Sequence, residues 1–147
     1  MNDWTPEMIE ERFVEAAAVL RRLPAPRSQG YFSTWPITIA EFSDLVGQTP
    51  GPMRLPPPSA AAISRMDAAL AWLRWLEVED ARLVWMRAEG KAWKAICWRF
   101  GIARATANRR MEFALSVIAW RLNRRPLPTK WSRQFLVDRV RFLSSAF

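Results

Sequence analysis

Residues 80–123, DARLVWMRAEGKAWKAICWRFGIARATANRRMEFALSVIAWRLN, contain the pattern that decides how this chain folds. Gly101 lies near the centre, where a tight turn needs a residue that tolerates a positive φ angle. Cys97, four residues earlier, is small enough for a close helix crossing, and Ile102 can fill the space between the two helices. The spacing predicts a helix-turn-helix, with one short helix ending at Gly101 and a second beginning near Arg104.

The second helix is predicted to be long and to bury one face. Its apolar residues recur at spacings of four, three, four and four, and they are Ala107, Met111, Ala114, Ile118 and Leu122. We therefore expect the helix to run from Arg104 to about Asn123. Its second half is expected to pack against the Trp-rich core rather than to contact a ligand.

The exposed face at the start of this helix carries side chains that are typical of DNA readout. Arg forms bidentate hydrogen bonds with guanine, Asn does so with adenine, and a small alanine allows contact with a thymine methyl. Thr, Arg and Lys at the flanks suit phosphate contacts, which position the protein. The predicted DNA-binding residues are Arg104, Ala105, Thr106, Asn108, Arg109, Arg110, Lys91 and Lys94. The alternative is a plain pair of helices with a solvated basic face.

Basic residues are concentrated in the same half of the chain. The formal net charge is +8, and the isoelectric point is about 11.1. Residues 1–73 carry six basic and eight acidic side chains, whereas residues 74–147 carry sixteen basic and six acidic side chains. A basic unit beside a mildly acidic one favours a polyanionic partner, and double-stranded DNA is the partner we expect.

The composition argues against several other classes of protein. The chain has one cysteine and no histidine, so it lacks an internal disulfide and the commonest general base and metal ligand. It also has no Gly-rich phosphate loop, and we expect no enzyme activity, no cofactor and no metal. Acids occupy residues 1–15 where a signal peptide needs a basic and then an apolar run, and no apolar run is long enough for a membrane span. A cytoplasmic location is therefore expected.

Residues 76–122 resemble the fourth conserved region of bacterial sigma factors. The residues that match its pattern are Gly90, Ile96, Gly101, Ile102, Thr106, Arg109 and Arg110. Ala103 replaces the usual Ser, which removes a helix cap, Ala107 replaces Val, and Trp93 stands where a polar residue is common. The resemblance implies a DNA-binding helix-turn-helix over about a third of the chain and does not extend to the other DNA-reading region of a sigma factor.

The whole chain also resembles a family of small proteins from bacterial and prophage genomes. The strings that carry this likeness are GYFSTWP at residues 30–36 and AWLRWL at residues 71–76. This second resemblance implies no chemistry.

The rest of the chain is predicted to be helical around a proline-rich connector. Thr5-Pro6-Glu7 starts an amphipathic helix, and residues 37–46 suggest a short one. Ser59 caps a helix running to Leu76, and Glu79 or Asp80 can begin another that covers residues 81–89. We therefore predict an all-α fold in four parts. These parts are an N-terminal helical unit (1–46), a Pro/Gly-rich connector (47–58), the helix-turn-helix domain (59–123), and a basic hinge with a C-terminal helix (124–147).

Two features leave alternatives open. Trp93 and Trp98 are five residues apart, so both cannot face inward, and one of them is expected to be exposed as a protein or DNA contact. The last helix has an apolar stripe that either folds back on its own domain or packs on a second copy or another protein. The stripe consists of Trp131, Phe135, Leu136, Val140 and Leu143.

The sequence favours a sequence-specific double-stranded DNA-binding protein, a bacterial or prophage transcriptional regulator with its second helix in the major groove. One alternative is a small terminase-like DNA-recognition subunit of a phage, which would form a ring. Another is a protein-interaction adaptor that docks on the transcription machinery through its basic face.

Overall fold

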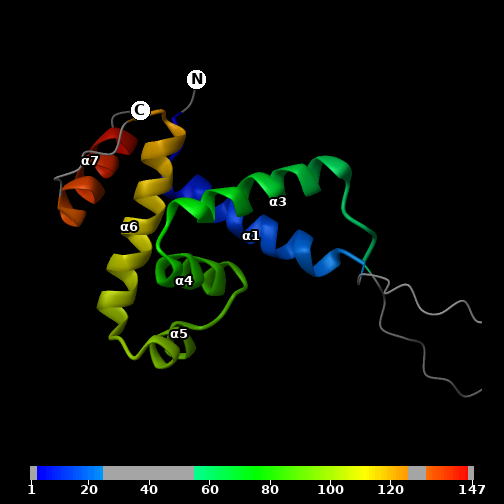
Figure 1. Cartoon of the computed structure of the whole chain (residues 1–147), viewed down its shortest axis with the longest axis horizontal. Coiled ribbons are helices and arrows are strands. Elements are labelled where there is room, and N and C mark those ends of the chain that lie inside the picture. Colours follow the sequence, from blue (N-terminus) through cyan, green and yellow to red (C-terminus); the bar gives the residue numbers. More distant parts are fainter. Residues whose placement is uncertain (1–2, 25–54, 126–131, 146–147) are drawn as a thin grey trace, which may run out of the picture.

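The computed structural model describes residues 3–24, 55–125 and 132–145, and all regular secondary structure within these ranges is helical (Figure 1). The elements in chain order are α1 (Pro6–Arg22), α3 (Ala60–Trp72), the 3-10 helix η1 (Leu73–Trp75), α4 (Val78–Ala88), α5 (Trp93–Phe100), α6 (Arg104–Leu122) and α7 (Arg133–Ser145). The all-α prediction is confirmed. The predicted helix over 37–46, connector residues 47–54, and Trp131 lie outside the described residues.

Polar side chains start two of the helices as the sequence predicts. The Thr5 hydroxyl accepts the backbone N–H of Met8 at 3.4 Å, and the Ser59 hydroxyl accepts that of Ala62 at 3.2 Å. These bonds satisfy amides that have no partner within the helix.

Two helix boundaries differ from the prediction. Helix α3 ends at Trp72 and continues as a 3-10 turn, so the α-helical part is shorter than residues 60–76. Helix α4 begins at Val78, just before the predicted start at Glu79 or Asp80. Its first turn contains Glu79 and Asp80, whose negative charges complement the positive end of the helix dipole.

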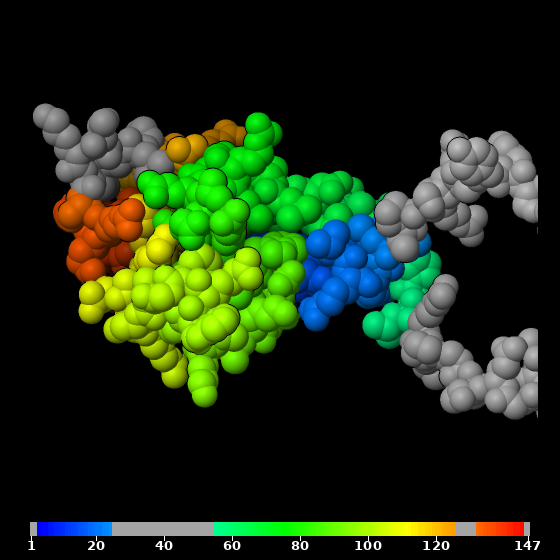
Figure 2. Space-filling view, turned by 60° about the horizontal axis from the view of Figure 1, so that its bottom comes forward, coloured from blue at the N-terminus to red at the C-terminus, as the bar shows by residue number. Residues whose placement is uncertain are grey.

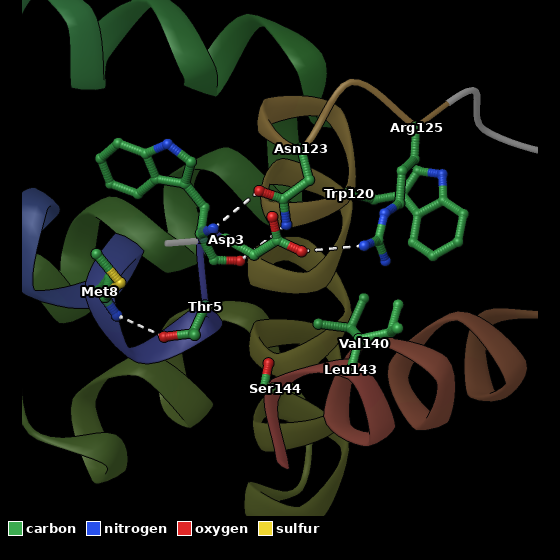
Figure 3. A pocket seen from close by; sticks show the side chains of 10 residues that line it. Asp3, Thr5, Met8, Trp120, Asn123, Arg125, Val140, Leu143 and Ser144 are labelled. Carbon is green, nitrogen blue, oxygen red and sulfur yellow. Dashed lines mark hydrogen bonds and ion pairs between the residues drawn. The ribbon is translucent and has the colours of Figure 1, made fainter. Parts of the chain in front are cut away.

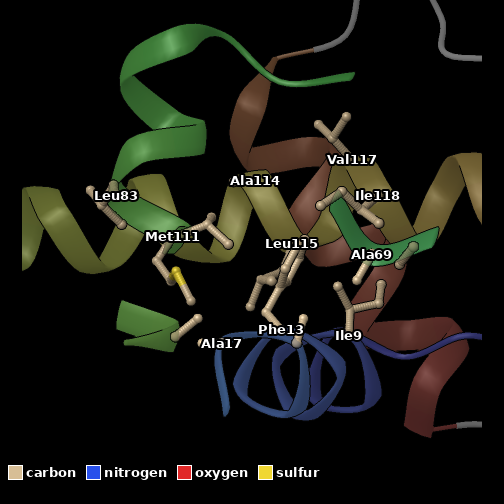
Figure 4. Packing of buried hydrophobic residues seen from close by; sticks show 14 of the residues in the cluster. Ile9, Phe13, Ala17, Ala69, Leu83, Met111, Ala114, Leu115, Val117 and Ile118 are labelled. Atoms are coloured by element: carbon tan, nitrogen blue, oxygen red, sulfur yellow. The ribbon is translucent and has the colours of Figure 1, made fainter. Parts of the chain in front are cut away.

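Helix α1 shares one hydrophobic core with the helices of the basic half. It lies against α3 and also contacts α4 and α6. Ile9 and Phe13 of α1 are almost fully buried, and Figure 4 shows them pointing towards Leu115 and Ile118 of α6. Burial of a side chain of this size stabilises the fold by about 1.5–3 kcal/mol. The N-terminal helix therefore belongs to the same packed unit as the helices that follow the connector.

The second half of α6 is the centre of this packing. All seven residues from 114 to 120 are buried, so no face of the helix meets solvent there. Helix α1 packs against α6, and α7 also packs against it (Figure 1). The predicted packing role of this half is confirmed.

Helix α7 folds back on its own chain. Leu136, Val137 and Val140 are buried and Leu143 is partly buried, whereas Phe135 is half exposed. The sequence allows Leu136 and Val140 to contact a partner, but in the structure they are covered by the molecule itself because the stripe packs into the shared core.

The end of α6 holds the N-terminal segment, a contact that no sequence pattern indicated (Figure 3). The Asn123 side chain accepts the Trp4 N–H at 2.8 Å and donates to the Trp4 carbonyl at 3.1 Å. Arg125 forms an ion pair with Asp3 at 3.0 Å. We call these two contacts the terminal clasp. A cavity of about 290 Å³ lies between it and α7.

No helix in the described ranges is both long enough and apolar enough to span a bilayer.

Candidate nucleic-acid interface

A tight turn at Gly101 separates α5 from α6. Gly101 has a left-handed backbone with φ of 62° and ψ of 32°, and its N–H binds the Trp98 carbonyl at 3.4 Å. The Ile102 N–H binds the Cys97 carbonyl at 3.2 Å, so two open carbonyls of α5 are satisfied. A side chain at Gly101 would have open space around it. The positive φ angle, rather than crowding, therefore calls for glycine here.

The two helices pack through the small and apolar residues that the spacing indicated. Ile96 and Ala107 are fully buried, and Cys97 and Ile102 are partly buried against the core. Helix α5 ends at Phe100, directly before the predicted end at Gly101, and α6 begins at Arg104, as predicted. Small residues at this crossing let the two helices approach and set the angle at which α6 leaves the turn.

Seven of the eight predicted DNA-binding residues are solvent-exposed on α5, α6 and the turn before α5. They are Lys91, Lys94, Arg104, Ala105, Thr106, Asn108 and Arg109. The run between Glu89 and Glu112 contains six basic side chains and no acidic one. We call the exposed residues of this run the basic face. They lie at the end of the molecule formed by α5 and the start of α6 (Figure 1).

Arg110 has a different position from the one that the sequence predicted. Its Nε and one terminal nitrogen each lie 2.7 Å from the same Asp80 carboxylate oxygen, and Asp80 is only 3% exposed. This ion pair connects α6 to α4, and the predicted phosphate contact of Arg110 stays a prediction. No local pattern marks this pair, because its members are 30 residues apart.

The start of α6 lacks a side-chain cap. Ala103 occupies the cap position with an extended backbone and forms no side-chain hydrogen bond, as its replacement of the usual Ser predicted. The first amides of α6 therefore have no acceptor from this side chain. These amides and the positive end of the helix dipole attract anions such as phosphate.

Trp98 and Arg99 extend the basic face beyond the predicted residues. Trp98 is 88% exposed, whereas Trp93 is partly buried with the Arg87 guanidinium 5.1 Å from its ring centre. The prediction that one of the two tryptophans is exposed is confirmed. Arg99 is exposed and did not appear among the predicted residues, although its place in the acid-free run was a signal for it.

The basic face has an acidic border on the side of α1. Asn108 lines a hollow together with Glu7 and Glu10 of α1, and the hollow is also lined by Arg87 and by Glu112, which pairs with Arg141 at 3.0 Å. A polyanion would therefore meet favourable charge near α5 and repulsion near α1. Figure 2 shows α1, in blue, beside the green surface of α4 and α5.

Within the described part of the chain, no three His, Cys, Asp or Glu side chains are grouped so that they could hold a metal ion.

The chain was also compared with known proteins. Residues 21–118, two thirds of the 147, match the family model described as "Domain of unknown function (DUF6362)". No curated protein matches the chain, and no solved structure does. The matched residues include all of α3, α4 and α5 and most of α6. The chain therefore belongs to the family described as Domain of unknown function (DUF6362).

Proposed function

We propose that this protein binds double-stranded DNA sequence-specifically, with the start of α6 in the major groove, and acts as a bacterial or prophage transcriptional regulator. The observation that carries the proposal is the basic face, where exposed cations crowd around an uncapped helix start without an acid among them. Phosphate neutralisation and the release of counterions supply most of the affinity of such a surface.

We assign some residues of the basic face to contacts with bases and others to contacts with phosphates. Arg104 and Asn108 are four residues apart, as are Ala105 and Arg109, so these four side chains lie on adjacent stripes of one helical face. Arg and Asn there are suited to guanine and adenine edges, while Ala105 permits close approach. Thr106, Lys91 and Lys94 are assigned to phosphates.

Arg110 is not one of the proposed DNA contacts, but it helps to hold the helix that carries them. Because Asp80 engages its guanidinium, Arg110 fixes the orientation of α6 relative to α4. A rigidly held helix keeps its exposed side chains in the geometry needed to read base edges. We therefore exclude Arg110 from the proposed DNA contacts.

Fluorescence anisotropy with a labelled duplex of about 30 base pairs tests the proposal. We expect Arg104→Ala/Arg109→Ala to weaken binding at least tenfold, because each arginine that no longer hydrogen-bonds a base edge costs about 1–3 kcal/mol. The steepness of the salt dependence should also decrease. Arg21→Ala/Arg139→Ala removes the same charge from exposed positions on α1 and α7, and it should retain most of the wild-type affinity.

Equal affinity of the wild type and both double variants would rule out α6 as the DNA-contacting helix. Selection of bound duplexes from a random pool tests specificity separately. An enriched motif supports base readout, whereas salt-sensitive binding without enrichment contradicts the sequence-specific part of the proposal.

A further inference from the structure

A groove on the outer side of α4 is left open by the fold, and of the residues assigned above to DNA contacts only Lys91 lines it. It is a hollow of about 860 Å³ between η1, α4 and α5. Its apolar lining includes Leu73, Leu76, Val78 and Met86. Val78 is 65% exposed, which is high for a valine beside other apolar groups. Such a surface gains free energy when another apolar surface covers it.

Cations surround this apolar strip. Arg74, Arg82, Lys91 and Arg99 line the groove and are all exposed, and among them Arg82 pairs with Glu79 at 3.3 Å. The one acid that lines it, Glu89, already accepts the Trp85 ring N–H at 3.0 Å. The groove is therefore complementary to an acidic surface with an apolar residue in its middle.

The exposed side of α1 has these properties. Glu7, Glu10 and Glu11 lie around Val14, which is 47% exposed. Among the described residues these three carboxylates form no hydrogen bond or ion pair. Glu7, Glu11 and Val14 follow at spacings of four and three, so they form one stripe along the helix.

We propose that the groove binds α1 of a second copy of this chain, with Val14 of that copy against Val78 and its glutamates against the cationic rim. The stripe from Glu7 to Val14 spans about 10 Å at 1.5 Å per residue, and the eleven residues of α4 span about 16 Å, so the stripe fits along the groove. The two surfaces differ, so copies that do not pair reciprocally add to one another head to tail.

Sedimentation velocity of the full chain, freed of nucleic acid, tests this association. Over about 10–200 μM at low salt, the wild type should associate reversibly above its monomer mass of 17.0 kDa. Added salt should weaken the association, because exposed charges are screened within about 10 Å at 0.1 M.

Val78→Glu places a negative charge in the groove, and Glu11→Arg places a positive charge in the stripe. Glutamate suits the first position of α4, where it favours the helix dipole, so the fold should survive while the groove loses its apolar centre and repels the stripe. Each variant should raise the apparent dissociation constant at least tenfold. Asp67→Arg makes the same charge change as Glu11→Arg at an exposed position on α3 and should associate like the wild type.

Mixing the two variants gives the sharpest result. The Val78→Glu chain keeps an intact stripe and the Glu11→Arg chain keeps an intact groove, so an equimolar mixture should regain a species of twice the monomer mass. A monomeric wild type, unchanged association in either variant, or a mixture that stays monomeric overturns the proposal. If Val78→Glu does not fold, Glu11→Arg against Asp67→Arg decides alone.

A further variant distinguishes failure of the DNA proposal from failure of the association proposal. Arg104→Ala/Arg109→Ala should still associate, because neither residue lines the groove or the stripe. Loss of association in that variant would contradict the assignment of the groove.

Discussion

The first and second halves of α6 have opposite surroundings, although they form one continuous helix. Of the residues from 104 to 109, only Ala107 is buried, and the others carry basic, polar or small side chains into solvent. Every residue from 114 to 120 is buried. The comparison shows how one helix can hold an exposed surface in a fixed orientation. The second half of α6, packed on all sides, fixes the direction of the solvent-exposed first half.

Ile118→Ala should have the largest effect on stability. Ile118 is fully buried, and truncation of such a side chain costs about 2–5 kcal/mol through reduced burial and the cavity left behind. Arg109→Ala at the exposed end should change the unfolding free energy by less than about 0.5 kcal/mol. Urea denaturation of both variants measures the contrast, and similar costs would remove the distinction between the two halves.

Asp80→Ala should have the next largest effect. It leaves Arg110 without its partner in a partly buried position, where the guanidinium side chain is 23% exposed. We expect a loss of about 1–3 kcal/mol, less than for a fully buried pair because water still reaches the cation. Arg110→Ala leaves the buried carboxylate unpaired, and it should likewise lower the free energy of unfolding. A neutral result in both variants would mean that the ion pair does not fasten α6 to α4.

Ala103→Ser should stabilise the protein by about 0.5–1 kcal/mol. The backbone at Ala103 is already extended, with φ of −68° and ψ of 152°, and a serine hydroxyl there can accept an amide of the first turn of α6. The change in melting temperature tests this gain, with Ala105→Ser as a control at an exposed helical position without a capping role. Equal stability in the two variants would show that the start of α6 is already satisfied.

Glu15→Gln should have the smallest effect and should depend on pH. The Arg65 side chain donates to the Glu15 carboxylate at 2.9 and 2.6 Å, and this contact holds the pKa of Glu15 below its ordinary value of 4.5. A lowered pKa means that the ionised group stabilises the folded state at neutral pH, and this contribution disappears as the pH falls through the folded pKa.

We therefore expect Glu15→Gln to lower the melting temperature slightly at pH 7 and to approach the wild type as the pH falls through the lowered pKa of Glu15 in the folded state. A difference that persists in acid would assign the effect to packing rather than to charge. The effect should be smaller than for Asp80→Ala, because the Glu15 and Arg65 side chains are 35% and 45% exposed and water weakens their attraction.

Local patterns in the sequence predicted the parts of the fold that depend on neighbouring residues. The spacing of Gly101, Cys97 and Ile102 located the turn, and the apolar repeat from Ala107 to Leu122 located the packed face of α6. The missing cap at Ala103 was also predicted, because capping depends on one residue and the turn that follows it.

The remaining features join residues that are far apart in the chain. Asp80 meets Arg110 across 30 residues, and Asn123 meets Trp4 across 119. Neither pair has a local signature, since an isolated Asp or Asn is compatible with many surroundings. The exposed positions on α6 were therefore predicted residue by residue, whereas the position of Arg110 depended on a tertiary contact.

The terminal clasp has a consequence for the order in which the molecule assembles. Closing a loop of this length in an unfolded chain costs about 4 kcal/mol of entropy, whereas α4, α5 and α6 meet through short connections. We expect these three helices to form early and the clasp to close last. In hydrogen exchange, the segment around Trp4 should then open without unfolding α6, so that one end of the protein can loosen while the basic face keeps its shape.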